Sequence, residues 1–286
     1  MTATETIDLS QWIGRTESVR ETLAPFPSRA LAALLDRDPD SAGDGEIPPL
    51  AHWLYFLPLH RQSELAPDGH VQRGGFMPPV PLPRRMFAGA RITFLQPLNI
   101  GTEARRVGRV TSIKSKTGRT GALTFVQVHQ EIEVPSGLAL MEEQDIVYRT
   151  HPSSGSLNVR SGGEPLENPQ WRETYRPDAS ALLRYSALLF NAHRIHYDHR
   201  YTTEIEHYPD LIVHGQLVAT LLADLAHQKG GPLASFAFRS HAPLFVDRQI
   251  TLTGRREGAL IRLAAEDESG LVAMTAEAEL RQVMPQ

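Results

Sequence analysis

The chain has 286 residues, of which 41% are hydrophobic and 22% charged, with a net charge of −4, values typical of one large or two ordinary globular domains. The negative net charge argues against non-specific binding to nucleic acid, and no run approaches the roughly 18 apolar residues of a membrane-spanning helix. Cysteine is absent, which excludes disulfides and thiolate chemistry. The polar first ten residues lack the features of a secretory signal, so we expect a cytoplasmic protein.

The first half of the chain combines one short helix with several strands. Leu31, Leu34 and Leu35 form one apolar stripe and predict a helix over residues 28–35. The segment 74–85 is too rich in glycine and proline for regular helix. Beyond it, apolar runs and alternating patterns between turn signals predict strands at 90–94, 103–114, 123–134 and 138–148.

The second half repeats the order of helix and then strands. Residues 150–178 are rich in Ser, Gly, Pro and Asn and are interpreted as a linker. Helices are predicted over 181–189 and 216–228, and strands over 233–240, 249–254, 260–266 and 272–281. Helices followed by strands, without β-α-β alternation, favour an α+β fold with an antiparallel sheet in each half. The predicted organisation is an N-terminal domain (1–149), a linker (150–178) and a C-terminal domain (179–286).

A cluster of polar residues in the second half points to proton-transfer chemistry. Residues 190–198 read Phe-Asn-Ala-His-Arg-Ile-His-Tyr-Asp, and an apolar run further on ends in Val-His-Gly at 213–215. This pattern resembles the motif of the MaoC-type (R)-enoyl-thioester hydratases. It is most similar to the branch that contains two-hotdog 3-hydroxyacyl-thioester dehydratases and the itaconyl-CoA and mesaconyl-C4-CoA hydratases. The resemblance implies a double hotdog, in which each half is a helix wrapped by an antiparallel sheet.

The resemblance also implies roles for individual residues. His196 occupies the position of the catalytic histidine, and imidazole suits proton transfer near neutral pH. Asn191 stands where the family usually has aspartate; because an amide does not act as a base, we expect it to orient water. His193 is either a second base or a supporting histidine. Gly215 begins a helix, where its N–H is expected to hold the thioester oxygen.

Substrate contacts are predicted on both halves. The resemblance places Tyr197 and His214 beside the substrate. Arg194 lies two residues before His196, so in an extended segment both side chains point to one side. Arg84 and Arg85 follow the proline-rich loop, and any of the three arginines could bind a substrate carboxylate, coenzyme A phosphates or solvent.

We therefore predict a hydratase or dehydratase acting on an enoyl-CoA thioester, with itaconyl-CoA or mesaconyl-CoA as preferred substrates and a fatty-acid 3-hydroxyacyl thioester of CoA or acyl-carrier protein as the alternative. No cofactor is expected beyond the coenzyme A of the substrate. No metal is expected, because the histidines lack ligand spacing. A homodimer or higher homo-oligomer is expected. Two rivals remain: a hotdog thioesterase that uses Asp224, and a non-catalytic acyl-CoA-binding protein.

Overall fold

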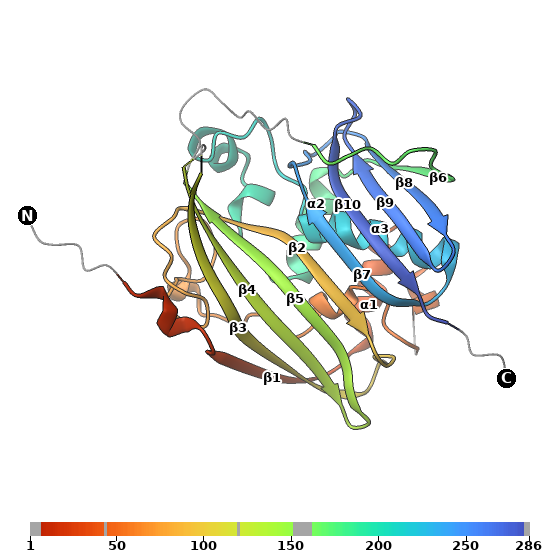
Figure 1. Ribbon diagram of the computed structural model, residues 1–286, viewed down its shortest axis with the longest axis horizontal. Coiled ribbons are helices and arrows are strands. Elements are labelled where there is room, and N and C mark those ends of the chain that lie inside the picture. The colour runs from red at the N-terminus through yellow and green to blue at the C-terminus, as the bar shows by residue number, and fades with distance from the viewer. Residues whose placement is uncertain (1–6, 43–44, 119–120, 151–161, 283–286) are drawn as a thin grey trace, which may run out of the picture.

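The computed structural model describes residues 7–42, 45–118, 121–150 and 162–282, in which ten strands form one antiparallel sheet (Figure 1). The strand order is β1-β3-β4-β5-β2-β7-β10-β9-β8-β6. The strands are β1 (Thr16–Thr22), β2 (Arg84–Phe94), β3 (Glu103–Gly118), β4 (Gly121–Val134), β5 (Gly137–Arg149), β6 (Trp171–Tyr175), β7 (Leu233–Ser240), β8 (Ile250–Glu257), β9 (Leu260–Glu266) and β10 (Val272–Leu280).

Three α-helices lie behind the sheet in the view of Figure 1: α1 (Pro25–Leu34), α2 (Ala179–Leu188) and α3 (Gly215–Gly230). Short helical turns join the elements: η1 (Leu9–Trp12), η2 (Pro39–Ala42), η3 (Ala51–Leu54), η4 (Gln62–Glu64), η5 (Arg194–His196) and the π-helical η6 (Tyr201–Ile205). α1 begins at a proline, whose fixed φ suits the first helical position. α3 is apolar on nearly every side and is accordingly buried along most of its length.

The two halves of the chain meet at the centre of the sheet. β2 pairs with β5 on one side and with β7 on the other, so that Ala90 lies opposite Phe238. Five strands stand on each side of this joint. The main hydrophobic core is continuous across it and includes Leu31 of α1, Leu182 of α2 and Leu222 of α3. The predicted α+β fold with an antiparallel sheet in each half is confirmed.

Two strands were missed by the sequence prediction, and both are edge strands. β1 is largely polar and pairs on one side only, with β3. β6 falls inside the predicted linker 150–178 and pairs with β8; residues 151–161 of that linker lie outside the described part of the chain. An edge strand needs no continuous apolar face, so the periodicity that reveals inner strands is weak there. The second half of the sheet thus begins before residue 179, and the two-domain division stays a prediction.

Candidate active site

A cavity of about 1490 Å³ lies between the two halves of the chain. Its wall includes the loop before β2, the first residues of β2, the loop after α2 and the N-terminus of α3. Ligand sites commonly occupy about 300–1,000 Å³, so this cavity has room for a large ligand such as a thioester of coenzyme A. Among the predicted site residues, those lining it are Asn191, His193, His196, Tyr197, Gly215, Arg84 and Arg85.

His196 is held as a neutral base at the cavity wall. It ends η5, the short helical turn that follows α2, and its Nδ1 lies 2.7 Å from the carbonyl oxygen of Ile212. Because a carbonyl only accepts hydrogen bonds, Nδ1 carries the proton and Nε2 keeps its lone pair. Burial lowers the pKa of His196 to about 4; the Ile212 hydrogen bond opposes this shift and nearby His70 adds to it. The side chain can therefore accept a proton at neutral pH.

His214 supports His196 from behind. Its ring stacks on that of His196, with centroids 3.6 Å apart and planes 16° apart, and its Nε2 lies 2.9 Å from Ser186 Oγ. His214 is fully buried, and burial lowers its pKa well below the ordinary value. It does not line the cavity in the described structure. The sequence predicted that His214 contacts the substrate. In the structure the ring of His196 stacks on His214 and separates it from the cavity.

Asn191 and His193 shape the loop in front of His196. The Asn191 Oδ1 accepts a hydrogen bond from the His193 backbone N–H at 3.0 Å, and among the described residues its NH₂ group has no partner, so this group is available to a ligand or water. The ring of His193 stands perpendicular to that of His196, with centroids 5.5 Å apart. Burial first, and then the neighbouring His70, lowers the pKa of His193 well below its ordinary value. Both residues face the cavity, and His193 is neutral at pH 7.

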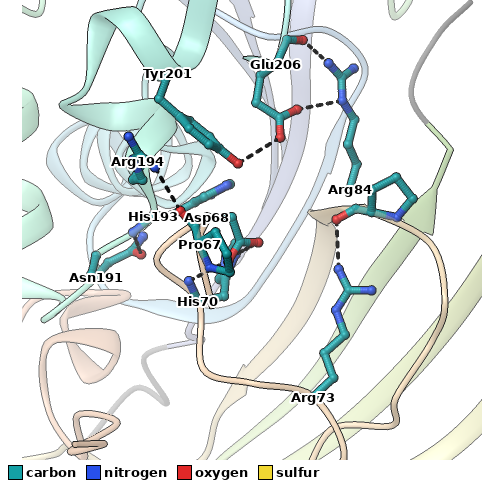
Figure 2. Close-up of polar contacts among 12 residues, drawn as sticks. Pro67, Asp68, His70, Arg73, Arg84, Asn191, His193, Arg194, Tyr201 and Glu206 are labelled. Atoms are coloured by element: carbon teal, nitrogen blue, oxygen red, sulfur yellow. Dashed lines mark hydrogen bonds and ion pairs between the residues drawn. The ribbon is translucent and has the colours of Figure 1, made fainter. Parts of the chain in front are cut away.

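The N-terminal half contributes Asp68 and His70, which sequence reasoning did not single out. The loop that carries them lies against the loop of His193, as Figure 2 shows. Within the described ranges, Asp68, His70 and His193 form the one group whose potential metal-ligating atoms lie within 4.8 Å of one another. The prediction of no metal was based on the spacing of histidines in the sequence, and spacing does not reveal residues that only the fold brings together. Burial lowers the pKa of His70, and the cationic Arg85 and Arg73 add to this shift while Asp68 opposes it. The charges of the two arginines also disfavour a divalent cation.

The three candidate arginines differ in their partners. The buried Arg84 donates to Glu206 through Nε at 2.8 Å and to the Glu206 backbone carbonyl (Figure 2). Its guanidinium lies over the Tyr208 ring. Arg194 pairs with the Asp198 carboxylate at 2.7 Å and donates to the carbonyl of Pro67.

Arg85 lines the cavity, and nothing in the described part of the chain pairs with its guanidinium. Residues 194–196 form the helical turn η5 and not the extended segment predicted from the sequence, and Arg194 does not line the described cavity. Its guanidinium stacks over the ring of Tyr201, 4.2 Å from the centroid. Of the three arginines, Arg85 is the one that can meet an anion without first losing a partner.

The remaining predicted residues occupy distinct places. Gly215 is the first residue of α3 and faces the cavity, and its N–H has no hydrogen-bond acceptor in the described structure. Tyr197 also lines the cavity and donates its hydroxyl to the carbonyl of Ala192 at 3.0 Å. Asp224, the carboxylate of the thioesterase alternative, is paired with Arg37, accepts from Gln228 at 2.7 Å and lies outside the cavity lining.

Comparison with known proteins places the chain in a family. The family model described as hydroxyacyl-thioester dehydratase type 2 matches residues 50–246. The mesaconyl-C(4)-CoA hydratase of Chloroflexus aurantiacus is 48% identical over 276 residues, which are 96% of this chain and 98% of that protein.

Solved structures agree on the fold. A MaoC-like dehydratase aligns with a TM-score of 0.73 at 13% identity and covers 96% of this chain and all of its own. A Mycobacterium tuberculosis protein described as having a double hotdog fold aligns with a TM-score of 0.54 at 10% identity, covering 93% of this chain and 96% of its own. These two likenesses support the double hotdog fold and nothing finer.

The chain belongs to the hydroxyacyl-thioester dehydratase type 2 family of double-hotdog proteins. Its 48% identity to a hydratase over nearly the whole length makes it a hydro-lyase, an enzyme that adds water to a carbon–carbon double bond or, in reverse, removes water from a hydroxy compound to form one. The predicted resemblance to the MaoC-type hydratases and the predicted fold class are confirmed. In the described residues, no helix is both long and apolar enough to cross a membrane.

Proposed function

We propose that this enzyme hydrates an enoyl-CoA whose acyl group carries a second carboxylate, with mesaconyl-C4-CoA as the preferred substrate. Two observations support this substrate. The first is the 48% identity to a mesaconyl-C(4)-CoA hydratase. The second is Arg85, an unpaired guanidinium at the cavity wall in the described structure. A carboxylate taken out of water needs a cationic or hydrogen-bonding partner, and arginine can bind it through two parallel hydrogen bonds.

The geometry around His196 supports a single-base mechanism. The lone pair on Nε2 takes a proton from water while the water oxygen bonds to Cβ of the substrate. The electron pair of the double bond moves to Cα and the thioester carbonyl, where the N–H of Gly215 and the positive end of α3 stabilise the developing charge. Cα then takes the proton back from the His196 imidazolium. The product gains one H and one OH, and the enzyme returns to its neutral state.

The test of this function is a comparison of substrates. Hydration removes the conjugated-thioester absorbance without releasing free thiol, whereas a thioesterase would release thiol. We expect kcat/KM for mesaconyl-C4-CoA to exceed that for crotonyl-CoA at least tenfold, equivalent to about 1.4 kcal/mol. Itaconyl-CoA carries the same kind of second carboxylate and is the next candidate to compare. Equal or better use of uncharged enoyl chains would favour a general 3-hydroxyacyl-thioester dehydratase, the activity in the name of the family model.

A variant of Arg85 tests the carboxylate contact itself. Arg85→Met should abolish the preference for the dicarboxylic substrate while leaving crotonyl-CoA hydration nearly unchanged. If Arg85 instead binds the phosphates of coenzyme A, both substrates should lose kcat/KM equally. Arg109→Met is a matched control, because Arg109 is exposed on β3 and lies outside the cavity lining.

Location and assembly stay proposals from the sequence. We propose a cytoplasmic enzyme that forms a homodimer or higher homo-oligomer. Light scattering coupled to size-exclusion chromatography measures the mass directly, and a monomer at micromolar concentration would contradict the proposed assembly.

A further inference from the structure

A tight turn of the N-terminal half is fitted against the loop that carries His193. The Arg194 N–H donates to the Asp68 carbonyl at 3.0 Å, and the Arg194 side chain donates to the Pro67 carbonyl at 3.0 Å. Gly69 adopts φ +91°, and a Cβ at this position would lie 1.8 Å from the carbonyl oxygen of Ala192. Only glycine permits this close approach, so the position of the Asp68 and His70 side chains relative to the catalytic loop is fixed by backbone contacts.

Asp68 orients His70 through two hydrogen bonds. One carboxylate oxygen accepts from the His70 backbone N–H at 3.0 Å, and the other lies 3.1 Å from His70 Nδ1. Because a carboxylate accepts hydrogen bonds, Nδ1 carries the proton and Nε2 presents a lone pair. Both residues line the cavity. The pair therefore presents a fixed hydrogen-bond acceptor to whatever occupies the cavity.

The acceptor on His70 stands in a row of imidazoles. The ring centroids of His70 and His193 lie 4.0 Å apart, and those of His193 and His196 lie 5.5 Å apart. The charged and titratable groups that act on His70 are Asp68, Arg73 and Arg85, with His193 and His196 alongside. Burial outweighs the carboxylate and lowers the pKa of His70, so it is neutral near pH 7. A neutral histidine can accept a hydrogen bond from water.

We propose that His70, oriented by Asp68, binds the attacking water together with His196, so that the N-terminal half supplies a catalytic residue of the hydratase. One water hydrogen points to His70 Nε2 and the other to His196 Nε2, which directs an oxygen lone pair at Cβ. His196 takes the proton and His70 keeps the hydrogen bond throughout. The oxygen of Asn191 already accepts from the backbone N–H of His193 and keeps one lone pair, so Asn191 can add a hydrogen bond to this water but, as an amide, cannot take its proton. This proposal rests on the proposed hydratase activity.

Kinetics of His70 and Asp68 variants test the proposal. His70→Ala should lower kcat for mesaconyl-C4-CoA at least about 10²-fold, within the range for a positioned group at the reacting water, while KM changes less than about threefold. Added imidazole should raise the kcat of His70→Ala at least fivefold, because the cavity is large enough to admit imidazole. Asp68→Asn should lower kcat by a smaller factor. The control is His129→Ala: His129 pairs with Glu143 on the same half of the chain but lies outside the cavity lining, so its loss should leave kcat unchanged.

A nitrogen-15 NMR titration of His70 provides a readout that needs no substrate. The wild-type protein should show His70 protonated on Nδ1, and Asp68→Asn should lower the pKa of His70, because the carboxylate raises it. A His70→Ala enzyme that keeps more than a tenth of normal kcat, or one whose lost rate imidazole does not restore, would overturn the water-binding role. A wild-type enzyme that hydrates neither mesaconyl-C4-CoA nor crotonyl-CoA would refute the proposed function instead, and a His70 protonated on Nε2 would refute the orienting role of Asp68.

Discussion

Arg84 and Arg85 are adjacent in sequence, but replacing them by methionine should affect thermal stability very differently. The Arg84 side chain is 5% exposed and its partner Glu206 10% exposed. Arg84→Met removes the ion pair and the backbone hydrogen bond that Arg84 makes with Glu206, and breaking a buried ion pair from one side costs about 3–5 kcal/mol. At roughly 2–4 °C per kcal/mol for a protein of this size, Arg84→Met should lower Tm by about 6–20 °C. Arg85 has no partner to leave behind in the described structure, so Arg85→Met should change Tm little.

The assay is thermal unfolding of Arg84→Met, Glu206→Gln and the double variant, with Arg85→Met as the comparison. The double variant should regain part of the lost stability, because the buried carboxylate is removed together with its guanidinium partner, and the double-mutant cycle should give a favourable coupling between the two side chains. An Arg84→Met protein that melts within about 2 °C of wild type but has lost turnover would refute this reasoning. That result would return Arg84 to the substrate-binding role predicted from the sequence.

Two further predictions concern the histidines. His196→Ala should lower kcat at least about 10²-fold with the fold retained, as measured by steady-state hydration and circular dichroism; a variant with more than a tenth of wild-type activity would exclude His196 as the base. Because the pKa of His196 is lowered to about 4, the unfolded state binds more protons between about pH 6.5 and 4, so stability is fully present above that window and is lost as pH falls through it. Denaturant titrations near pH 5 measure how the free energy of unfolding changes with pH. This slope should be up to about 1.4 kcal/mol per pH unit smaller in His196→Ala than in wild type. Equal slopes would show that His196 is not buried as the neutral form.

Local sequence patterns predicted the inner part of the fold. The strands β7 and β9 match their predicted ranges, and β3, β4 and β5 extend theirs by a few residues, because each has an apolar face or run that the 2-residue period reveals. The strands β1 and β6 escaped prediction because each pairs on one side only. α3 was recognisable from its length and apolar content.

The site was predictable only where its residues are close in sequence. His193, His196 and Gly215 stand within one motif, and all three line the cavity. His70 reaches the same cavity from a loop more than a hundred residues away, and no local pattern encodes that contact.

The sequence also could not show which of Arg84 and Arg85 is paired within the protein and which is available to a ligand. Successive side chains of a strand point to opposite faces, and which arginine meets Glu206 depends on the π-helical turn η6, which ends just before that glutamate.

We propose that the enzyme adds water to a carbon–carbon double bond in this cavity while the thioester stays intact. Incubation of the wild-type enzyme with mesaconyl-C4-CoA in ¹⁸O-labelled water, followed by mass spectrometry, tests this claim most directly. We expect a product that has gained one labelled water in the acyl group and still carries coenzyme A, and this product should be nearly absent with His196→Ala. Free coenzyme A with the label in a released carboxylate would contradict the proposed hydration, as would the absence of any labelled thioester.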